Sequence, residues 1–158
     1  MQFQKFNESI LIIDFGSQVT KLIARRIRDL GVHSEIVTPN EVKKIRDYSK
    51  VKGIIFSGGP SSVTKSKYQN VPKHIFTKKI PILGICYGLQ LIAKLYGGKI
   101  KSSNKRREFG RTFIFKKSQS LLTKNFFSPK VAVWMSHEDA VVKLQRVLDQ
   151  LLLQKILN

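Results

Sequence analysis

The residues best suited to chemistry lie at positions 84–88, where the sequence reads Gly-Ile-Cys-Tyr-Gly around Cys86, the only cysteine of the chain. An apolar stretch precedes this segment and a helical pattern follows it. Glycines two residues before and two after a nucleophile are typical of a sharp strand-to-helix turn that lifts the nucleophile above a sheet. A side chain at either glycine would collide with the neighbouring strand or with the helix start. The alternative is that Cys86 is a buried, inert small hydrophobe.

As a nucleophile, Cys86 needs a lowered pKa and hydrogen-bond donors for developing negative charge. A helix that starts directly after Cys86 is expected to favour the thiolate through the helix dipole and unpaired N–H groups. Backbone N–H groups of the Gly58-Gly59 loop and of Tyr87 are candidates for an oxyanion hole. An acyl-thioester mechanism would follow, with a histidine as base and a carboxylate to orient it.

The surrounding elements predict how Cys86 is positioned. Apolar stretches at residues 10–13, 53–56 and 81–85 predict strands, and an alternating pattern at residues 32–37 predicts another. Helical patterns at residues 18–30, 38–45, 71–79 and 89–95 alternate with them. Gly31 and the Gly97-Gly98 pair predict helix ends. This order predicts an α/β fold with an open, mostly parallel sheet that carries helices on both faces.

In such a sheet, sites form outside the carboxyl ends of the strands. The glycine-rich turns after Ile13, after Phe56 and at Cys86 would therefore share one edge. Beyond Gly98 the pattern changes, and residues 112–115 and 131–135 predict later strands, with a loop at 126–129 and a polar turn at 135–139. The basic residues between positions 99 and 107 predict a solvated loop.

Composition predicts one globular domain of ordinary type. The chain has 158 residues, of which 42% are hydrophobic and 25% charged. One cysteine excludes an intramolecular disulfide, and one cysteine with three scattered histidines predicts no metal site. We expect no signal peptide, no membrane span and a cytoplasmic location, because no apolar stretch is long enough for either segment.

The charge balance is unusual, with 29 Lys+Arg against 10 Asp+Glu and a formal net charge of +19. Such a balance favours association with anions, nucleic acids included. However, the lysines are dispersed, and no stretch of the sequence interleaves them with aromatic residues. We therefore expect no specific nucleic-acid partner and retain nucleic-acid binding as an alternative function.

Several segments together resemble the class-I glutamine amidotransferases, and within them the amidotransferase part of the GMP synthases. The resemblance runs in order through an opening, an oxyanion loop, the nucleophile turn, a loop near the site and a substrate-contacting turn. These segments are residues 14–18 with 23–26, residues 57–60, residues 84–90, residues 108–111 and residues 134–137. Tyr87, together with the Asp-Phe-Gly-Ser-Gln opening at residues 14–18, separates the pattern from other members of the family.

The resemblance implies hydrolysis of L-glutamine through a thioester on Cys86. Backbone N–H groups of Gly59 and Tyr87 would hold the oxyanion. Gln90, and the backbone around Ser136 and His137, would contact glutamine. The released ammonia would serve the amination of XMP to GMP, with ATP and Mg²⁺ bound by a synthetase domain or by a separate synthetase subunit. No cofactor is implied for residues 1–142 themselves.

The sequence departs from the family pattern in one important respect. The family's base and orienting carboxylate come from a His-Pro-Glu motif late in the domain, and these 158 residues contain none. His137 belongs to the substrate-contacting turn, where Glu138 replaces a glycine. His33 and His74 are not placed as bases. Without a positioned base, Cys86 is expected to lose several orders of magnitude in rate. Recruitment of His137 is the alternative.

The family resemblance covers residues 1–142 and stops in the segment 143–158. Apolar residues at 144, 147, 148, 151, 152 and 156 fit an amphipathic helix. Read one nucleotide out of frame, residues 145–158 can encode a family-like segment that starts Lys-Gly-Phe. We expect a frameshifted tail on a C-terminally truncated synthase remnant. The alternative is a genuine short subunit that ends in a helix.

Two functions of different class follow. The leading one is the glutaminase part of a GMP synthase, impaired or inactive in this chain. The other is a catalytically dead module that binds glutamine or a synthetase partner. Ammonia release that depends on Cys86 separates the two.

Overall fold

A four-stranded parallel sheet forms the centre of the molecule. The computed structural model describes residues 8–102, 108–115, 130–137 and 139–143. Within them the parallel strands lie in the order β2-β1-β3-β4. Their bounds are Ser9–Ile13 (β1), Ser34–Val37 (β2), Val51–Phe56 (β3) and Ile82–Gly84 (β4). These are the four strands that the sequence predicts in this region, with shifted ends.

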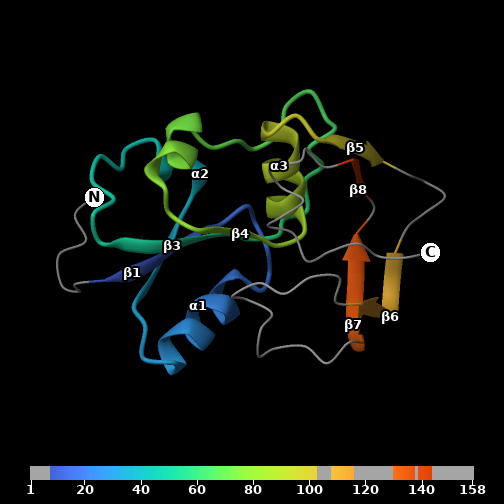
Figure 1. The fold of residues 1–158 in the computed structure, drawn as a ribbon, viewed down its shortest axis with the longest axis horizontal. Coiled ribbons are helices and arrows are strands. Elements are labelled where there is room, and N and C mark those ends of the chain that lie inside the picture. The colour runs from blue at the N-terminus through green and yellow to red at the C-terminus, as the bar shows by residue number, and fades with distance from the viewer. Residues whose placement is uncertain (1–7, 103–107, 116–129, 138, 144–158) are drawn as a thin grey trace.

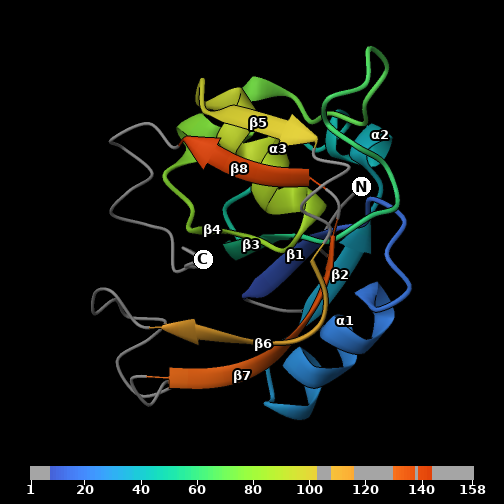
Figure 2. The same cartoon turned by 90° about the vertical axis from the view of Figure 1, so that its right-hand side faces the viewer.

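Helices cover both faces of this sheet. Helix α1 (Thr20–Asp29) lies on one face, and α2 (Pro39–Val42) and α3 (Tyr87–Leu95) lie on the other (Figure 1, Figure 2). The predicted helix at 71–79 is a shorter 3-10 helix, η1 (Lys73–Lys78), which ends where Lys79 adopts a left-handed conformation. The predicted α/β fold is confirmed.

The glycines that are predicted to end α1 and α3 have the geometry of a Schellman motif. Gly31 and Gly97 both have a φ of 78°. The N–H of Gly31 donates to the carbonyl of Arg28 (2.9 Å), and the N–H of Val32 donates to that of Ile27 (3.2 Å). Such paired bonds satisfy carbonyls that the helix end leaves open, and the conformation favours glycine because it has no Cβ.

The apolar strands supply most of the core. Leu11, Ile13, Ile54 and Phe56 are at most 1% exposed and pack with residues of α3 such as Leu91. Strands buried on both faces read as continuous apolar runs rather than alternating ones, which is why β1 and β3 are visible in the sequence. Figure 1 shows β1, β3 and β4 with their carboxyl ends directed towards α3.

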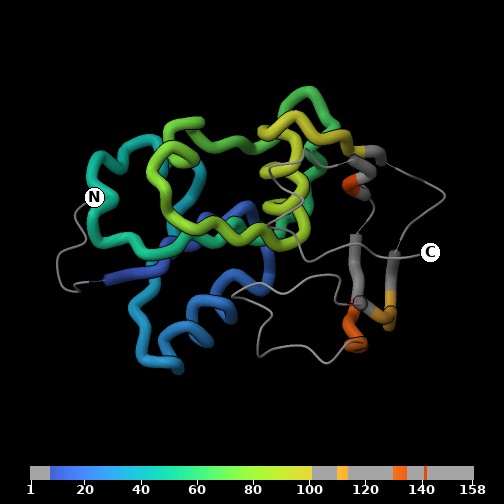
Figure 3. Tube along the Cα trace, viewed as in Figure 1, coloured from blue at the N-terminus to red at the C-terminus, as the bar shows by residue number. Residues whose placement is uncertain are grey.

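The second half of the chain adds two antiparallel pairs. Strand β5 (Lys99–Ser102) pairs with β8 (Asp139–Lys143), and β6 (Glu108–Phe115) pairs with β7 (Lys130–His137). The trace in Figure 3 places these yellow to red segments at the end of the molecule opposite the start of β1. Strands β5 and β8 lie beside α3 (Figure 2).

Three sequence expectations are wrong in this region. Residues 99–102 form a strand rather than part of a basic loop, because β8 supplies pairing partners about 40 residues along the chain. Residues 108–111 belong to β6 rather than to a loop. Ser136 and His137 end β7 instead of forming a turn, since Phe109 and Glu108 pair with them. Cross-strand pairing outweighed the local polarity of all three segments.

Some sequence predictions lie outside the described residues. They are the start of the chain, the loop at 126–129, the replacement of glycine by Glu138, and the tail from residue 144 on, whether read as a helix or as a frameshift product. The domain boundary between residues 142 and 143 stays a prediction.

Candidate active site

Cys86 sits on a strained turn between β4 and α3. Its φ is 47° and its ψ is −110°, a backbone conformation that residues other than glycine rarely adopt. Neighbouring hydrogen bonds hold this conformation. The N–H of Ile85 donates to the carbonyl of Phe56 (2.9 Å), and the N–H of Gly88 donates to the carbonyl of Ser57 (3.1 Å). Backbone strain fixed in this way is a frequent feature of functional sites.

The two glycines around Cys86 have the roles that the sequence predicts for them. A Cβ on Gly88 would overlap the carbonyl of Phe56 at the end of β3. A Cβ on Gly84 would lie 2.6 Å from the Cα of Leu89 in the first turn of α3. The turn therefore has no room for a side chain at either position.

The loop after β3 lies directly beside the cysteine. A Cβ built on Gly58 would be 3.6 Å from the Cβ of Cys86 and 3.6 Å from the hydroxyl oxygen of Ser17. The Ser57 hydroxyl fixes this loop, because it accepts the N–H of Phe15 (3.1 Å) and donates to the carbonyl of Gly58 (2.8 Å). Segments following β1, β3 and β4 thus meet at one edge of the sheet.

Two backbone donors remain open near Cys86. Within the described part of the chain, no hydrogen bond engages the N–H of Gly59 or the N–H of Tyr87. Gly59 has no room for a Cβ, which would overlap the carbonyl of Phe15. Tyr87 is the first residue of α3, where N–H groups lack partners within the helix. Both groups can therefore donate to a bound anion.

The remaining predicted site residues are less fully described. Gln90 lies one helical turn after Cys86 and is 7% exposed. Its backbone N–H donates to the carbonyl of Cys86 (3.1 Å). Ser136 and His137 are placed by their backbones at the end of β7, and their side chains lie outside the description. The roles of all three towards glutamine stay predictions.

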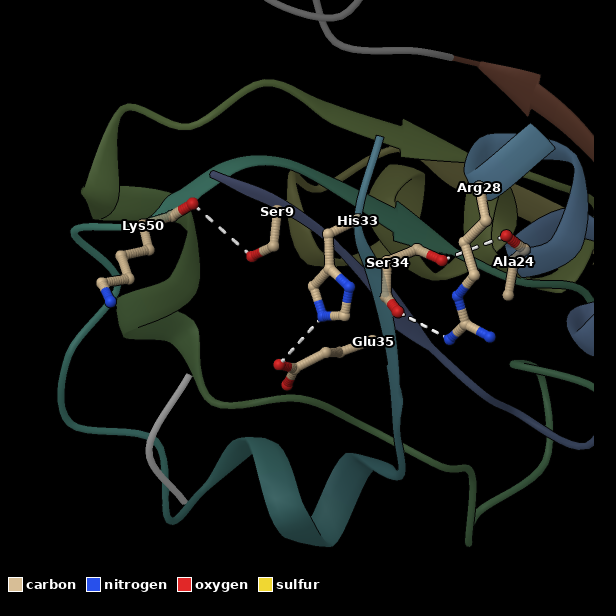
Figure 4. Close-up of polar contacts among 7 residues, drawn as sticks. All are labelled: Ser9, Ala24, Arg28, His33, Ser34, Glu35 and Lys50. Atoms are coloured by element: carbon tan, nitrogen blue, oxygen red, sulfur yellow. Dashed lines mark hydrogen bonds and ion pairs between the residues drawn. The ribbon is translucent and has the colours of Figure 1, made fainter. Parts of the chain in front are cut away.

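The two histidines with described side chains lie at the opposite edge of the sheet from Cys86. His33 precedes β2 and its Nε2 lies 3.4 Å from Glu35 Oε1 (Figure 4). His74 in η1 stacks edge-on against Tyr48, which precedes β3. Because the strands are parallel, the amino ends of β2 and β3 lie a strand length away from the carboxyl end of β4. Neither histidine can act as a base for Cys86.

Burial changes the expected ionisation of Cys86. The Cys86 side chain reaches solvent, but surrounding protein atoms displace part of its water and raise the pKa of the thiol. From the sequence alone, we expect the start of α3 to lower the pKa of the Cys86 thiol. Loss of hydration is the cause of the raised pKa, and no described cation lies beside the sulfur to lower it.

The raised pKa predicts slow alkylation of Cys86 at neutral pH. The rate with iodoacetamide should keep rising beyond about pH 8.5, the ordinary thiol pKa, because only the thiolate reacts. The same chain unfolded in urea is the control, and mass spectrometry gives an unambiguous readout because there is one cysteine. A folded chain whose rate levels off at a lower pH than the unfolded chain would contradict this assignment.

Sequence reasoning missed two supports of the site. The Asp14 carboxylate accepts the N–H of Gly16 (2.9 Å) and the hydroxyl of Thr20 (2.8 Å), which shapes the loop after β1. The Asp-x-Gly spacing could have indicated this turn. The Tyr87 hydroxyl donates to the carbonyl of Gln69 (2.6 Å), and burial raises the pKa of Tyr87 to about 12. No sequence signal pointed to that contact.

A polar cleft of about 540 Å³ opens near the carboxyl ends of β1 and β2. Cys86 is not among the residues that line it, so the cleft is separate from the nucleophile. Its walls come from the ends of the two strands, from α2 and from the loop before η1. The lining residues are Asp14, Thr38, Pro39, Asn40, Lys43, Tyr68, Gln69, Asn70, Val71 and Pro72.

Two further findings apply only to the described ranges. Side chains of histidine, cysteine, aspartate and glutamate form no cluster there that could hold a metal ion. No helix in those ranges combines the length and the apolar character needed to cross a membrane.

Comparison with known proteins places the chain in a family. The model of the glutamine amidotransferase class-I family matches residues 11–155. A GMP synthase (glutamine-hydrolyzing) of Treponema denticola is 49% identical over 142 residues, which are 90% of this chain and 27% of the relative. The corresponding enzyme of Zymomonas mobilis is 47% identical over 140 residues, 87% of this chain and 27% of the relative. The chain thus spans about a quarter of the length of these relatives.

Solved structures show the same fold. A Thermoplasma acidophilum protein described as one subunit of a GMP synthase matches with a TM-score of 0.71 and 25% identity, over 90% of this chain and 71% of that one. A glutamine amidotransferase from Thermotoga maritima matches with a TM-score of 0.70 and 22% identity, over 90% and 65% of the two chains.

Proposed function

The chain belongs to the class-I glutamine amidotransferase family, and from this premise we propose that Cys86 hydrolyses L-glutamine to glutamate and ammonia. The observation that carries the proposal is the strained turn of Cys86 between β4 and α3, with the Gly58-Gly59 loop beside it. A cysteine held at positive φ with open N–H donors nearby is costly for a merely structural residue.

The proposed reaction has two steps. The Cys86 thiolate attacks the side-chain amide carbon of glutamine, and the N–H groups of Gly59 and Tyr87 stabilise the oxyanion. The amide nitrogen takes up a proton and leaves as ammonia, which produces a thioester on Cys86. Water then attacks the thioester carbonyl, releasing glutamate and the free thiol. Gln90, Ser136 and His137 hold glutamine in this scheme.

We further propose that the ammonia serves the conversion of XMP to GMP. The support is that relatives at 47–49% identity are named GMP synthase and extend well beyond the region that this chain matches. ATP and Mg²⁺ would be bound by a synthetase polypeptide, in the same protein or as a separate subunit. We assign none of the 158 residues to ATP, Mg²⁺ or XMP.

Turnover by the chain alone is proposed to be slow, because a base is not positioned. None of the three histidines is followed by Pro-Glu. Burial also raises the thiol pKa, so that little thiolate is present at neutral pH. Recruitment of His137 as the base is the alternative route to activity.

Added imidazole tests this assignment. If Cys86 lacks a base, imidazole at high concentration should raise ammonia release from glutamine by about tenfold, since a placed base contributes far more than that. Cys86→Ala is the control and should show no response. Rapid ammonia release without imidazole would overturn the proposed impairment, and a His137→Gln variant would then identify the recruited base.

A second candidate function is a binding module without catalysis. The raised pKa of Cys86 and the placement of His33 and His74 at the far edge favour it. This alternative predicts glutamine binding, measured by calorimetry, with no ammonia release under any buffer. Imidazole rescue that depends on Cys86 would exclude it.

A further inference from the structure

The β6–β7 ribbon gathers aromatic and cationic side chains on one face. Arg111 lies opposite Trp134, and Phe113 lies opposite Ala132, in the antiparallel register of the two strands. Residues directly opposite one another and residues two apart along a strand share a face. Arg111, Phe113, Lys130 and Trp134 therefore occupy the same side of the ribbon.

This face is exposed to solvent, whereas the described residues on the other side are half-buried. Trp134 is 81% exposed and Phe113 is 43% exposed. Arg111, Lys130 and Ala132 are also exposed, and the half-buried residues Thr112, Val131 and Val133 alternate with them along the two strands. The ribbon lies outside the parallel sheet (Figure 1, Figure 2). An exposed tryptophan beside a second exposed aromatic ring is a common mark of a binding surface.

Two positively charged side chains lie close to the Phe113 ring. The Lys130 ammonium lies 4.1 Å from the centre of the Phe113 ring, and the Arg111 guanidinium carbon lies 5.9 Å from it. These contacts hold two positive charges next to the Phe113 ring. Trp134, which pairs with Arg111 in the strand register, is exposed and leaves its ring open to a ligand.

The chemistry of this face matches a polyanion that carries flat rings. Proteins bind single-stranded nucleic acid by stacking its bases on aromatic side chains while basic side chains neutralise the phosphates. Phe113 and Trp134 are diagonal neighbours on the two strands, a separation of about 7–8 Å. The whole chain carries a formal net charge of +19, which adds long-range attraction for a polyanion.

We propose that the β6–β7 ribbon face binds single-stranded nucleic acid, with bases stacked on Trp134 and Phe113 and phosphates held by Arg111 and Lys130. Duplexes do not fit this mode, because their bases are already stacked on each other. The proposal does not depend on the glutaminase, because no ribbon-face residue belongs to the Cys86 turn.

Tryptophan fluorescence tests the proposal directly, because Trp134 is the only tryptophan of the chain. Titration with an oligouridylate of about 12 nucleotides at low salt should quench the emission of Trp134. Affinity measured by anisotropy of labelled RNA should fall roughly tenfold or more in Trp134→Ala. Trp134→Phe should retain most of the affinity, because phenylalanine also stacks. Circular dichroism checks that each variant is folded.

A matched pair of double variants distinguishes binding at the β6–β7 ribbon face from attraction by the net charge of the chain. Arg111→Gln with Lys130→Gln should reduce the slope of log affinity against log salt concentration by about 1.4, since each phosphate contact on a single strand contributes about 0.7. Lys21→Gln with Arg25→Gln, both exposed on α1, removes the same charges elsewhere and should leave the quenching of Trp134 intact. Polyphosphate, which has no bases, should not quench.

Three results would overturn the proposal. They are no quenching at low salt, equal loss of affinity in the two double variants, and quenching by polyphosphate as strong as by RNA. Any of them would mean that the ribbon face contacts an acidic protein surface or attracts anions only through its charge.

Discussion

Gly88→Ala should lower the free energy of unfolding by about 3 kcal/mol or more, enough to leave a marginally stable domain largely unfolded. The added Cβ would overlap the carbonyl and the Cβ of Phe56, and both belong to a central strand that cannot move aside. The loss should appear as a lower urea midpoint in circular dichroism.

Gly58→Ala is the matched control for this variant. Its Cβ would make only ordinary contacts, at 3.6 Å from the Cβ of Cys86 and from the Ser17 hydroxyl oxygen. We expect its urea midpoint to stay close to that of the unchanged chain. Equal stability of Gly88→Ala and Gly58→Ala would show that α3 does not approach β3 as closely as described.

Replacing Cys86 separates activity from stability. Cys86→Ala and Cys86→Gly should both reduce ammonia release from glutamine to the background, because neither side chain can form a thioester. Only glycine relieves the strained backbone at a φ of 47°. Cys86→Gly should therefore be more stable than Cys86→Ala by about 1 kcal/mol.

Urea denaturation of the two Cys86 variants measures this difference. A strained turn that serves catalysis lowers the stability of the fold. Cys86→Gly removes the strain, so this variant should be more stable than Cys86→Ala although both are inactive. If Cys86→Gly is less stable than Cys86→Ala, the turn is not strained. If either variant still releases ammonia from glutamine faster than buffer does, another residue carries the chemistry.

The parallel sheet and the turn at Cys86 could be predicted because short-range signals specify them. Strands β1 and β3 each contain a continuous apolar stretch, and Gly31 and Gly97 end helices through a local conformation that favours glycine. Gly84 and Gly88 mark the turn for a similarly local reason, since they lie within two residues of Cys86. Each of these signals is complete within a few residues of sequence.

The antiparallel pairs could not be predicted in full, because their strands depend on distant partners. Lys99–Ser102 is polar by itself and becomes a strand only beside Asp139–Lys143. The ribbon face has the same origin, since Arg111 and Phe113 meet Lys130 and Trp134 only through β6–β7 pairing. Each stretch holds one of these charges and one of these rings, and the sequence does not show that the two stretches lie side by side.

The ionisation of Cys86 is also a property of the folded chain. The sequence places a helix start after Cys86, which favours the thiolate. How much water the neighbouring segments remove from the sulfur depends on β1, β3 and β4 meeting at one edge, and that burial raises the pKa. A local motif identifies Cys86 as the candidate nucleophile but does not specify the surroundings that control the pKa of its thiol.

Active-site labelling tests the central claim, that Cys86 is the nucleophile of a glutamine site. The probe is a glutamine analogue whose side-chain amide is replaced by a chloromethyl ketone, which a cysteine thiolate alkylates. Intact-protein mass spectrometry should show one adduct, located on Cys86, and L-glutamine should slow its formation while D-glutamine does not. An adduct that forms equally fast with and without L-glutamine would contradict the account, as would no adduct under conditions in which iodoacetamide modifies Cys86.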